Sequence, residues 1–474
     1  MKGLKAAALL APAVVAIPSP WMRDLHTALA AVAPNAVLAR LGLWNAEKIS
    51  GVLEHGSQTV ITTGHNVLTS GQRTVKQWTE HGREFIQKGE NLYERIAHPS
   101  TPALADYQLR LTLNETGELA SPNICDNVKQ RAGYLDISDD RHLFFWFFEA
   151  RNDPEDAPLL LWLNGGPGCS SSTGLLMELG PCLATQGGGT KPNPHSWNTN
   201  FHNIYLDQPV DVGFSYRSGG GGVNNSPAAA EDVWAFLQLF VKKFPQYAHK
   251  IHLAAESYGG HYAPNIAAVI HKHNLEIKAA TVPTNLQVIN LASVILANGL
   301  SEPKTQMASV PDFACDGPFH VFDPESQECA SLRSKAATCE RLVQSCYNNN
   351  SRFTCVPAAL YCWSQMFGSF QQLGLNPYDV RRKCDKDEDG PLCYREMGYI
   401  EEFLNLPETK KALGAEEGIK FESCNMEVNQ AFMFQGDGMH NSAALLPTIL
   451  DAGIRVLVYA GNADCTSYFL FLSS

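Results

Sequence analysis

The sequence lacks three features that would each indicate a particular class of protein. It has no excess of basic residues, since 36 Lys and Arg against 48 Asp and Glu give a net charge of −12, and nucleic acids require a basic face. It has no stretch approaching about 20 apolar residues, the length that spans a bilayer. None of its 13 cysteines forms a C-x-x-C pair, the tight spacing that zinc ribbons use. We therefore expect no nucleic-acid partner, no membrane span and no metal.

The start of the chain has the composition of a signal peptide. Two lysines precede a short apolar run over residues 6–17, and Val14 and Ala16 are small residues suited to a cleavage site. The run is too short to cross a bilayer. A buried N-terminal helix is the alternative to a signal peptide. The pattern predicts a signal peptide over residues 1–16 and passage through the secretory pathway.

Residues 17–105 lack cysteine and strand-like runs, unlike the rest of the chain. Apolar residues recur at near-helical spacing among charged residues over positions 75–96, and Pro99 and Pro102 end that pattern. We interpret residues 17–105 as a pro-segment with an amphipathic helix. A small N-terminal domain of the mature protein is the alternative.

Short apolar runs alternate with helical patterns from about residue 130 onward. The runs 159–163 and 251–255 are apolar throughout, as in strands that are covered on both faces. This alternation predicts an α/β fold with a mostly parallel sheet. We expect the sheet and its helices to occupy residues 106–300 and 400–474.

A cysteine-rich stretch over residues 301–399 interrupts the alternation. Nine cysteines lie between Cys315 and Cys424, and in a secreted protein this density predicts disulfides rather than zinc ligands. The stretch is expected to be a helical, disulfide-rich lid over one end of the sheet. Three sequons agree with the secretory route and predict N-glycosylation, at Asn114, Asn224 and Asn349.

The run Ala254–Tyr262 (AAESYGGHY) follows an apolar strand and opens a helical pattern. This is the setting of a nucleophile elbow, in which a sharp turn projects Ser257 above the sheet. Gly259 fits the usual G-x-S-x-G pattern, whereas Ala255 stands where the first glycine is usual. A plain strand-to-helix turn is the alternative to a catalytic serine.

A second run, Leu161–Ser171 (LWLNGGPGCSS), also follows a strand and is rich in glycine. Such glycines let backbone N–H groups approach a bound oxygen, and a serine that transfers acyl groups needs two donors for its oxyanion. One donor is expected at Gly166 and the other at Tyr258, which follows the nucleophile. A turn that only makes the fold compact is the alternative.

Together with the run Asp207–Tyr216 (DQPVDVGFSY), these motifs resemble the serine carboxypeptidase family. Ser351–Cys362 (SRFTCVPAALYC) and Glu422–Asn425 (ESCN) resemble its vacuolar members in particular. The resemblance covers about residue 120 to Asp464 and implies an α/β-hydrolase fold. It also implies an enzyme that releases single residues from the C-termini of peptides through an acyl-enzyme.

The resemblance carries roles onto single residues of this chain. Ser257 would be the nucleophile, and Asp464 would orient a catalytic histidine. Gly166 and Tyr258 would donate the oxyanion N–H groups. The substrate carboxylate would be bound by Trp162, Asn164, Gly165, Glu178 and Glu256.

The two expected glutamates give a physical reason for an acidic pH preference. Glu178 and Glu256 would face a third carboxylate, so at least one of the two should hold a proton. Without the family context, Glu178 would be interpreted as an ordinary glutamate on a helix surface.

The resemblance also implies five disulfides, each of which would stabilise the fold by about 2–4 kcal/mol. They are Cys169–Cys424, Cys315–Cys329, Cys339–Cys362, Cys346–Cys355 and Cys384–Cys393. Cys125, Cys182 and Cys465 are left over, and a Cys125–Cys182 bridge is one option.

The sequence has no histidine after Asp464, although the α/β-hydrolase order is Ser, Asp, His. The residues that follow Asp464 read CTSYFLFLSS. His261 lies on the helix after Ser257, and His440 precedes Asp464, so neither is expected to substitute. We expect a truncated C-terminus that lacks a final strand or helix. The explanations are a truncated or misread gene model, an inactive paralogue that binds peptide C-termini, and a related acyltransferase, which would also need the histidine.

The resemblance implies peptide substrates, no cofactor and a monomer. It favours the vacuole, reached through the secretory pathway, with the extracellular space as the alternative.

Overall fold

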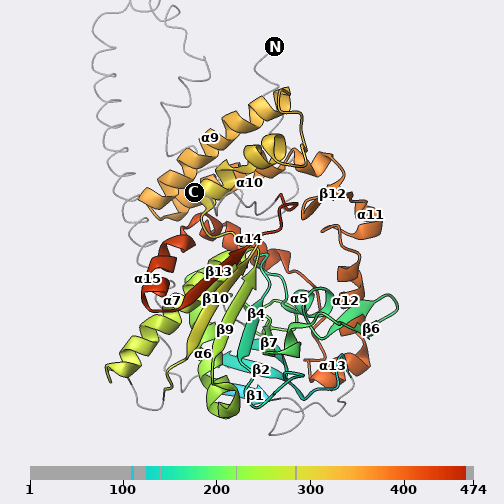
Figure 1. Ribbon diagram of the computed structural model, residues 1–474, viewed down its shortest axis with the longest axis vertical. Helices are drawn as coiled ribbons and strands as arrows, with labels where there is room; N and C mark the ends of the chain where they lie inside the picture. Colours follow the sequence, from blue (N-terminus) through green and yellow to red (C-terminus); the bar gives the residue numbers. More distant parts are fainter. Residues whose placement is uncertain (1–107, 112–123, 139, 220, 283–285, 466–474) are drawn as a thin grey trace, which may run out of the picture. The chain divides into compact units, whose positions relative to one another are not determined.

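The computed structural model describes residues 108–111, 124–138, 140–219, 221–282 and 286–465 (Figure 1). These residues belong to one compact unit, Tyr93–Ser474. The expected signal peptide, the expected pro-segment with its helix and the sequon at Asn114 lie outside the described residues.

The described strands form one main sheet in the order β1-β2-β3-β7-β4-β9-β10-β13, with β8 paired to β3. The pairs from β7 through β4, β9 and β10 to β13 are parallel, and those of β1, β2, β3 and β8 are antiparallel. The predicted α/β fold with a mostly parallel central sheet is therefore confirmed. The strands are β1 (Gln108–Leu111), β2 (Gln130–Ser138), β3 (Arg141–Phe148), β4 (Leu159–Leu163), β7 (His202–Leu206), β8 (Tyr216–Arg217), β9 (Ile251–Glu256), β10 (Leu291–Ala297) and β13 (Arg455–Tyr459).

Apolar side chains cover both faces of this sheet. Successive residues of a strand point to opposite faces, so Phe145 and Phe147 of β3 enter one core while Phe144, Trp146 and Phe148 enter the other. The first core is closed by α6 (Ser226–Lys243), α7 (Gly259–Lys278) and α15 (Leu446–Asp451), and the second by α5 (Ser172–Met177), α12 (Glu396–Leu404) and α13 (Pro407–Leu413).

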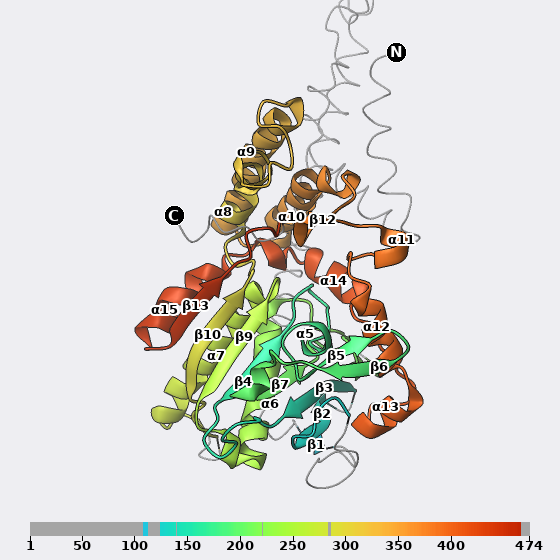
Figure 2. The same cartoon turned by 45° about the vertical axis from the view of Figure 1, so that its right-hand side comes forward.

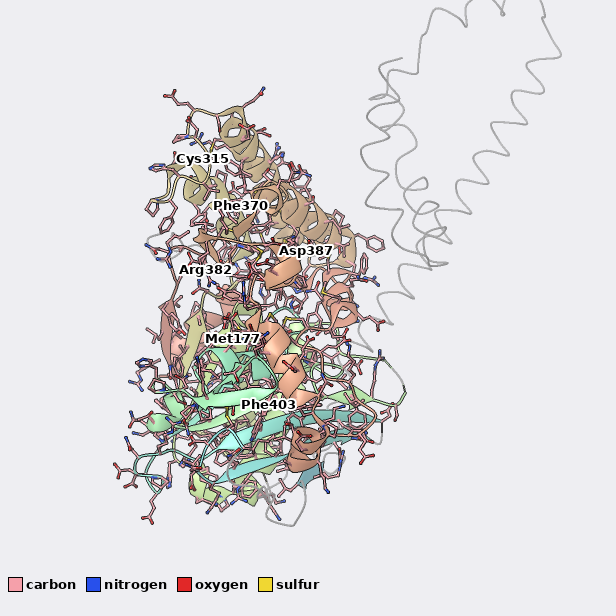
Figure 3. The ribbon with its side chains drawn as sticks, turned by 90° about the vertical axis from the view of Figure 1, so that its right-hand side faces the viewer. Met177, Cys315, Phe370, Arg382, Asp387 and Phe403 are labelled. Atoms are coloured by element: carbon pink, nitrogen blue, oxygen red, sulfur yellow. A yellow bond between two sulfur atoms is a disulfide. The ribbon has the colours of Figure 1, made fainter. Side chains whose placement is uncertain are left out.

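The cysteine-rich insertion is mostly helical, as predicted, and has a core of its own. Its helices α9 and α10 lie beyond the carboxyl ends of the central strands (Figures 1 and 2). Figure 3 shows Cys315, Phe370 and Asp387 in the insertion and Met177 and Phe403 in the part around the sheet. Its elements are α8 (Pro303–Ala308), η5 (Asp312–Asp316), α9 (Gln327–Asn348), α10 (Arg352–Phe367), η6 (Phe370–Gln372), β11 (Leu375–Asn376), β12 (Asp379–Lys383) and α11 (Lys386–Asp389).

Helix α12 crosses the boundary expected at residue 399 and ends at Leu404, because its buried residues pack on the second core of the sheet. The chain then returns to the sheet through α14 and β13. The remaining described elements are β5 (Cys182–Thr185), β6 (Gly189–Pro192), η3 (Trp197–Thr199), η4 (Pro245–Tyr247), α14 (Met426–Met433), η7 (Asp437–Met439) and η8 (Ser442–Leu445).

Six disulfides join twelve of the cysteines. The structure contains the five pairs that the resemblance implied, and a sixth joins Cys125 to Cys182. Cys465 is a free, buried thiol. Within the part of the chain that the structure describes, no helix is long and apolar enough to cross a membrane.

Candidate active site

Ser257 lies in a sharp turn between β9 and α7. Its φ of +57° is in the left-handed region, which costs a residue with a Cβ on the order of 1–3 kcal/mol. Three backbone hydrogen bonds hold the turn. The Ser257 N–H donates to the Ala297 carbonyl at 3.0 Å, and the Ser257 carbonyl accepts from the Gly260 N–H at 3.0 Å and from the Leu300 N–H at 2.9 Å. The sharp strand-to-helix turn that a nucleophile elbow requires is therefore present at Ser257.

The departure from G-x-S-x-G at Ala255 has a steric explanation. A Cβ placed on Gly259 would lie 2.6 Å from the Ala255 Cβ, so the two positions are in contact across the elbow. One of them can carry a methyl group only if the other carries none. Glycine at 259 therefore makes alanine at 255 acceptable.

The glycine-rich loop after β4 lies directly against the elbow. A Cβ on Gly165 would be 2.3 Å from the Tyr258 nitrogen and 3.0 Å from the Ser257 Cβ. Gly166 has a φ of +109° and is exposed, while its neighbours in the loop are mostly buried. The Cys169–Cys424 disulfide ties this loop to the later chain. The loop and the elbow thus bring backbone groups close to Ser257 where an oxyanion would form.

Asn164 is oriented by two hydrogen bonds to its side-chain oxygen. Trp162 Nε1 donates to Asn164 Oδ1 at 2.9 Å, and the Gly174 N–H donates to the same oxygen at 2.8 Å. The Asn164 Nδ2 amide is therefore directed the other way, and it lies 3.4 Å from Glu256 Oε2. Its donor hydrogens face the acidic side of the site.

Glu178 and Glu256 are two neighbouring carboxyl groups that both line the cavity around Ser257. Burial raises the pKa of Glu178. Burial first, and then the charges of Glu178 and Asp464, raise the pKa of Glu256 well above its ordinary value. Ionising both of these buried neighbouring carboxyls is unfavourable, so the pair favours a state in which at least one of them is protonated.

Asp464 follows β13 and is 7% exposed. Asn298 Nδ2, at the end of β10, donates to Asp464 Oδ2 at 2.8 Å. The insertion also holds this loop, because the Val380 N–H donates to the Ala463 carbonyl and the Cys465 N–H donates to the Pro377 carbonyl, each at 3.0 Å. The lid and the sheet together fix the aspartate.

One cavity of about 730 Å³ brings these groups together. It is lined by every expected site residue except Tyr258, whose side chain is buried behind the elbow. It also contains residues that sequence reasoning missed, among them Asn298, Trp197, Tyr378, Asp379, Arg381 and Tyr394. Asn298 had a usable signal, since it directly follows a parallel strand and such strand ends meet at the site.

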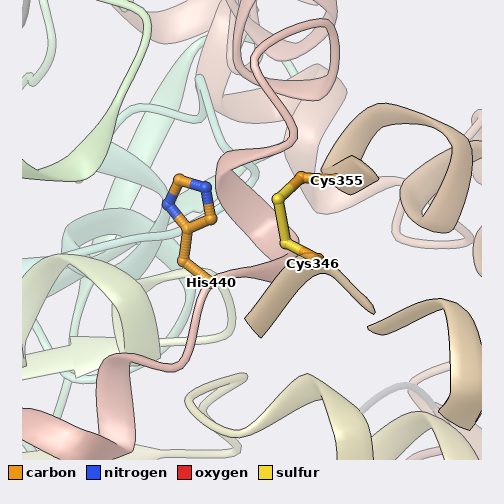
Figure 4. A group of neighbouring side chains, drawn as sticks. All are labelled: Cys346, Cys355 and His440. Carbon is orange, nitrogen blue, oxygen red and sulfur yellow. A yellow bond between two sulfur atoms is a disulfide. The ribbon is translucent and has the colours of Figure 1, made fainter. Parts of the chain in front are cut away.

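No histidine lines this cavity within the described part of the chain. His261 is fully buried and stacks on the Tyr258 ring, and burial lowers its pKa to about 4. His440 lies beside the Cys346–Cys355 disulfide (Figure 4). The expectation that neither histidine serves Ser257 agrees with these positions.

The sequence and the fold were compared with known proteins. The family model described as serine carboxypeptidase matches residues 122–471. The chain is 46% identical over 364 residues to carboxypeptidase Y homolog A of Coccidioides posadasii, covering 76% of this chain and 64% of the relative. It is 45% identical over 377 residues to carboxypeptidase Y of Schizosaccharomyces pombe, covering 78% of this chain and 36% of the relative. The chain thus spans less than two thirds of the length of either relative.

Among solved structures, the fold is similar to Kex1(delta)p, a prohormone-processing carboxypeptidase from Saccharomyces cerevisiae. The TM-score is 0.62 at 24% identity, with 77% of this chain and 80% of the other covered. This likeness concerns the fold, and it agrees with the predicted α/β-hydrolase architecture. The family match extends over most of the chain, including the elbow, the glycine-rich loop and the aspartate. The chain belongs to the serine carboxypeptidase family.

Proposed function

We propose that the protein releases C-terminal amino acids from peptides through an acyl-enzyme on Ser257, at acidic pH. The observation that carries this proposal is the position of Asn164, Glu178 and Glu256 in the same cavity as Ser257. Hydrogen-bond donors and a protonated carboxyl there bind a substrate's terminal carboxylate. A carboxylate bound beside the nucleophile restricts cleavage to the last peptide bond.

In the proposed reaction, the Ser257 hydroxyl attacks the carbonyl of the last peptide bond. The Gly166 and Tyr258 N–H groups stabilise the oxyanion, the C–N bond breaks, and the last residue leaves as an amine that takes up the serine proton. Water then hydrolyses the ester and regenerates Ser257. A histidine oriented by Asp464 would carry this proton, and among the described residues none lines the cavity.

The raised pKa values of Glu178 and Glu256 set the expected pH dependence. In acid the shared proton donates a hydrogen bond to the substrate carboxylate. As the pH rises through the raised pKa values, both groups ionise and repel that carboxylate, so KM should rise by roughly tenfold or more from the acid side of this titration to its alkaline side. The measurement is KM and kcat for an N-blocked dipeptide across this range, with binding affinity in place of KM where turnover is slow.

The variant Glu178→Gln tests which groups cause this effect. The amide donates a hydrogen bond at every pH, so the rise in KM should become shallower while kcat changes little. The control is Glu402→Gln, because Glu402 accepts a hydrogen bond from the Gly187 N–H and does not line the cavity. This variant should leave the dependence of KM on pH unchanged. An unaltered profile in Glu178→Gln would contradict the assigned role.

A second candidate function is binding of peptide C-termini without turnover. The observation in its favour is that no histidine among the described residues lines the cavity, because a serine without a general base is a poor nucleophile. A chain that binds the dipeptide but releases product about 10⁴–10⁶ times more slowly than family members would support it. A related acyltransferase would instead transfer its acyl group to an added alcohol in preference to water.

We also propose the vacuole, reached through the secretory pathway, as the site of action. Six disulfides suit an oxidising compartment, and the two relatives above are named carboxypeptidase Y and its homolog. Asn349, exposed at the end of α9, is the better placed of the two described sequons for a glycan, since Asn224 is partly buried. The protein is proposed to act as a monomer.

A further inference from the structure

The side chain of Tyr258 does not enter the cavity, although its backbone N–H is placed there by the proposed function. Its hydroxyl donates a hydrogen bond to Asp437 Oδ2 at 2.7 Å, in η7, at a sequence separation of 179 residues. We propose that Asp437 is a positioning residue, which fixes the oxyanion N–H of Tyr258 by holding the Tyr258 ring. This inference rests on the proposed function of Ser257 and its oxyanion site.

Asp437 is 1% exposed, and both of its carboxylate oxygens accept hydrogen bonds. Ser226, the first residue of α6, donates its N–H to Oδ1 at 3.0 Å and its hydroxyl to Oδ2 at 2.6 Å. The N-terminus of an 18-residue helix favours a negative charge at this position. Asp437 is thus a buried acceptor whose two oxygens receive hydrogen bonds from the start of α6 and from Tyr258.

The Tyr258 ring is also enclosed on its sides. His261 stacks on it with ring centroids 4.8 Å apart and an interplanar angle of 14°, and Phe432 meets it edge-on at 6.0 Å. A Cβ on Gly438 would lie 3.1 Å from the ring, so the chain beside Asp437 also contacts it. Burial and the charge of Asp437 raise the pKa of Tyr258 well above its ordinary value, which keeps the phenol protonated as a donor.

The position of the ring fixes the position of the amide. Tyr258 is the residue immediately after Ser257, whose left-handed backbone has easier conformations available if its neighbours are released. The Tyr258 nitrogen faces Gly165 at close range, so a small rotation of this peptide would move the N–H away from the oxyanion. A hydrogen bond that prevents the rotation therefore acts on the transition state rather than on the bound substrate.

The insertion supports Asp437 from its other side. A Cβ on Gly436 would lie 2.5 Å from the Cys355 Cβ, and Cys346 Sγ is 3.5 Å from the Met439 carbonyl oxygen. His440, beside the Cys346–Cys355 disulfide, has its Nδ1 3.7 Å from Asp437 Oδ1 (Figure 4). The turn that carries Asp437 is therefore packed between the lid disulfide and the elbow.

The test compares two ligands on the full chain carrying Ser257→Ala, so that no turnover is needed. One is an N-blocked dipeptide, and the other is its phosphonate analogue, whose tetrahedral anionic oxygen takes the place of the oxyanion. Asp437→Asn and Tyr258→Phe should each weaken binding of the phosphonate by about tenfold or more, and should leave the planar dipeptide within about twofold. The double variant should bind the phosphonate no more weakly than the weaker-binding of the two single variants, because both substitutions remove the same hydrogen bond between Tyr258 and Asp437.

Asp126→Asn is the matched control, since Asp126 is another acid with side-chain partners, Arg151 and Asn198, and neither it nor those partners line the cavity. It should leave the preference for the phosphonate intact. If Asp437→Asn does not fold, Tyr258→Phe, which removes a single hydroxyl, decides the question alone. An unchanged phosphonate preference in folded variants overturns the role of Asp437. Failure of the parent chain to bind either ligand overturns the proposed function instead.

Discussion

Replacing Ser257 with alanine is expected to abolish release of C-terminal residues. Where the rate of the parent chain is high enough to measure such a difference, the rate should fall by a factor of about 10⁴–10⁶. The serine hydroxyl is the atom that forms the covalent bond. Of the two described lining residues that have a Cβ and a positive φ, Ser257 and Asn298, only the serine carries a nucleophilic hydroxyl. The measurements are the initial rate of release from an N-blocked dipeptide and the mass of the protein after treatment with a fluorophosphonate.

The parent chain should gain one phosphonyl adduct on the peptide that contains Ser257, and the variant should gain none. Ser301→Ala is a suitable control, since Ser301 is buried, donates its hydroxyl to the Gly260 carbonyl and does not line the cavity. It should keep both release and labelling. Release or labelling that persists in Ser257→Ala would contradict the assignment of the nucleophile.

The second large effect is expected for Gly165→Ala. The new methyl group would lie 2.3 Å from the Tyr258 nitrogen and 2.6 Å from the Glu256 carbonyl oxygen, both backbone atoms that cannot rotate away. The loop or the elbow must shift, and the oxyanion site opens. We expect a loss of about 10²–10³ in the rate of release or of fluorophosphonate labelling, as for removal of one oxyanion donor.

A matched control for this variant is Gly398→Ala in α12, where a Cβ would meet nothing within 4 Å. Alanine is the better helix former, so this change should leave labelling unaltered and raise the thermal midpoint slightly. Full labelling in Gly165→Ala, in a protein that melts as the parent does, would show that the loop does not contribute to the site.

The sequence predicted the central strands well because strands that are buried on both faces are apolar throughout. The bounds of β4, Leu159–Leu163, coincide with the apolar run, because a central parallel strand is buried on both faces. The same reasoning is less informative for β13. Its run is apolar after Arg455, yet Leu457 is 54% exposed and Tyr459 39% exposed. An apolar run therefore indicates a strand but not what covers it.

The candidate site was predictable where its residues lie in one motif and not where distant segments meet. Asn164, Gly165 and Ser257 stand in runs whose glycines and spacing carry information. Tyr378, which lines the same cavity from the insertion, has no local signal, because its position depends on how the lid folds over the sheet. Asp437 is similar, since only the three-dimensional structure brings it to Tyr258.

Recognition of a free C-terminal carboxylate beside Ser257 is the central feature of the proposed function. The direct measurement is calorimetric binding of one N-blocked peptide, with either a free or an amidated C-terminus, to the Ser257→Ala chain at mildly acidic pH. Several hydrogen bonds to a charged group should make the free acid bind about 100-fold more tightly than the amide. Equal affinity for the two peptides would contradict the account.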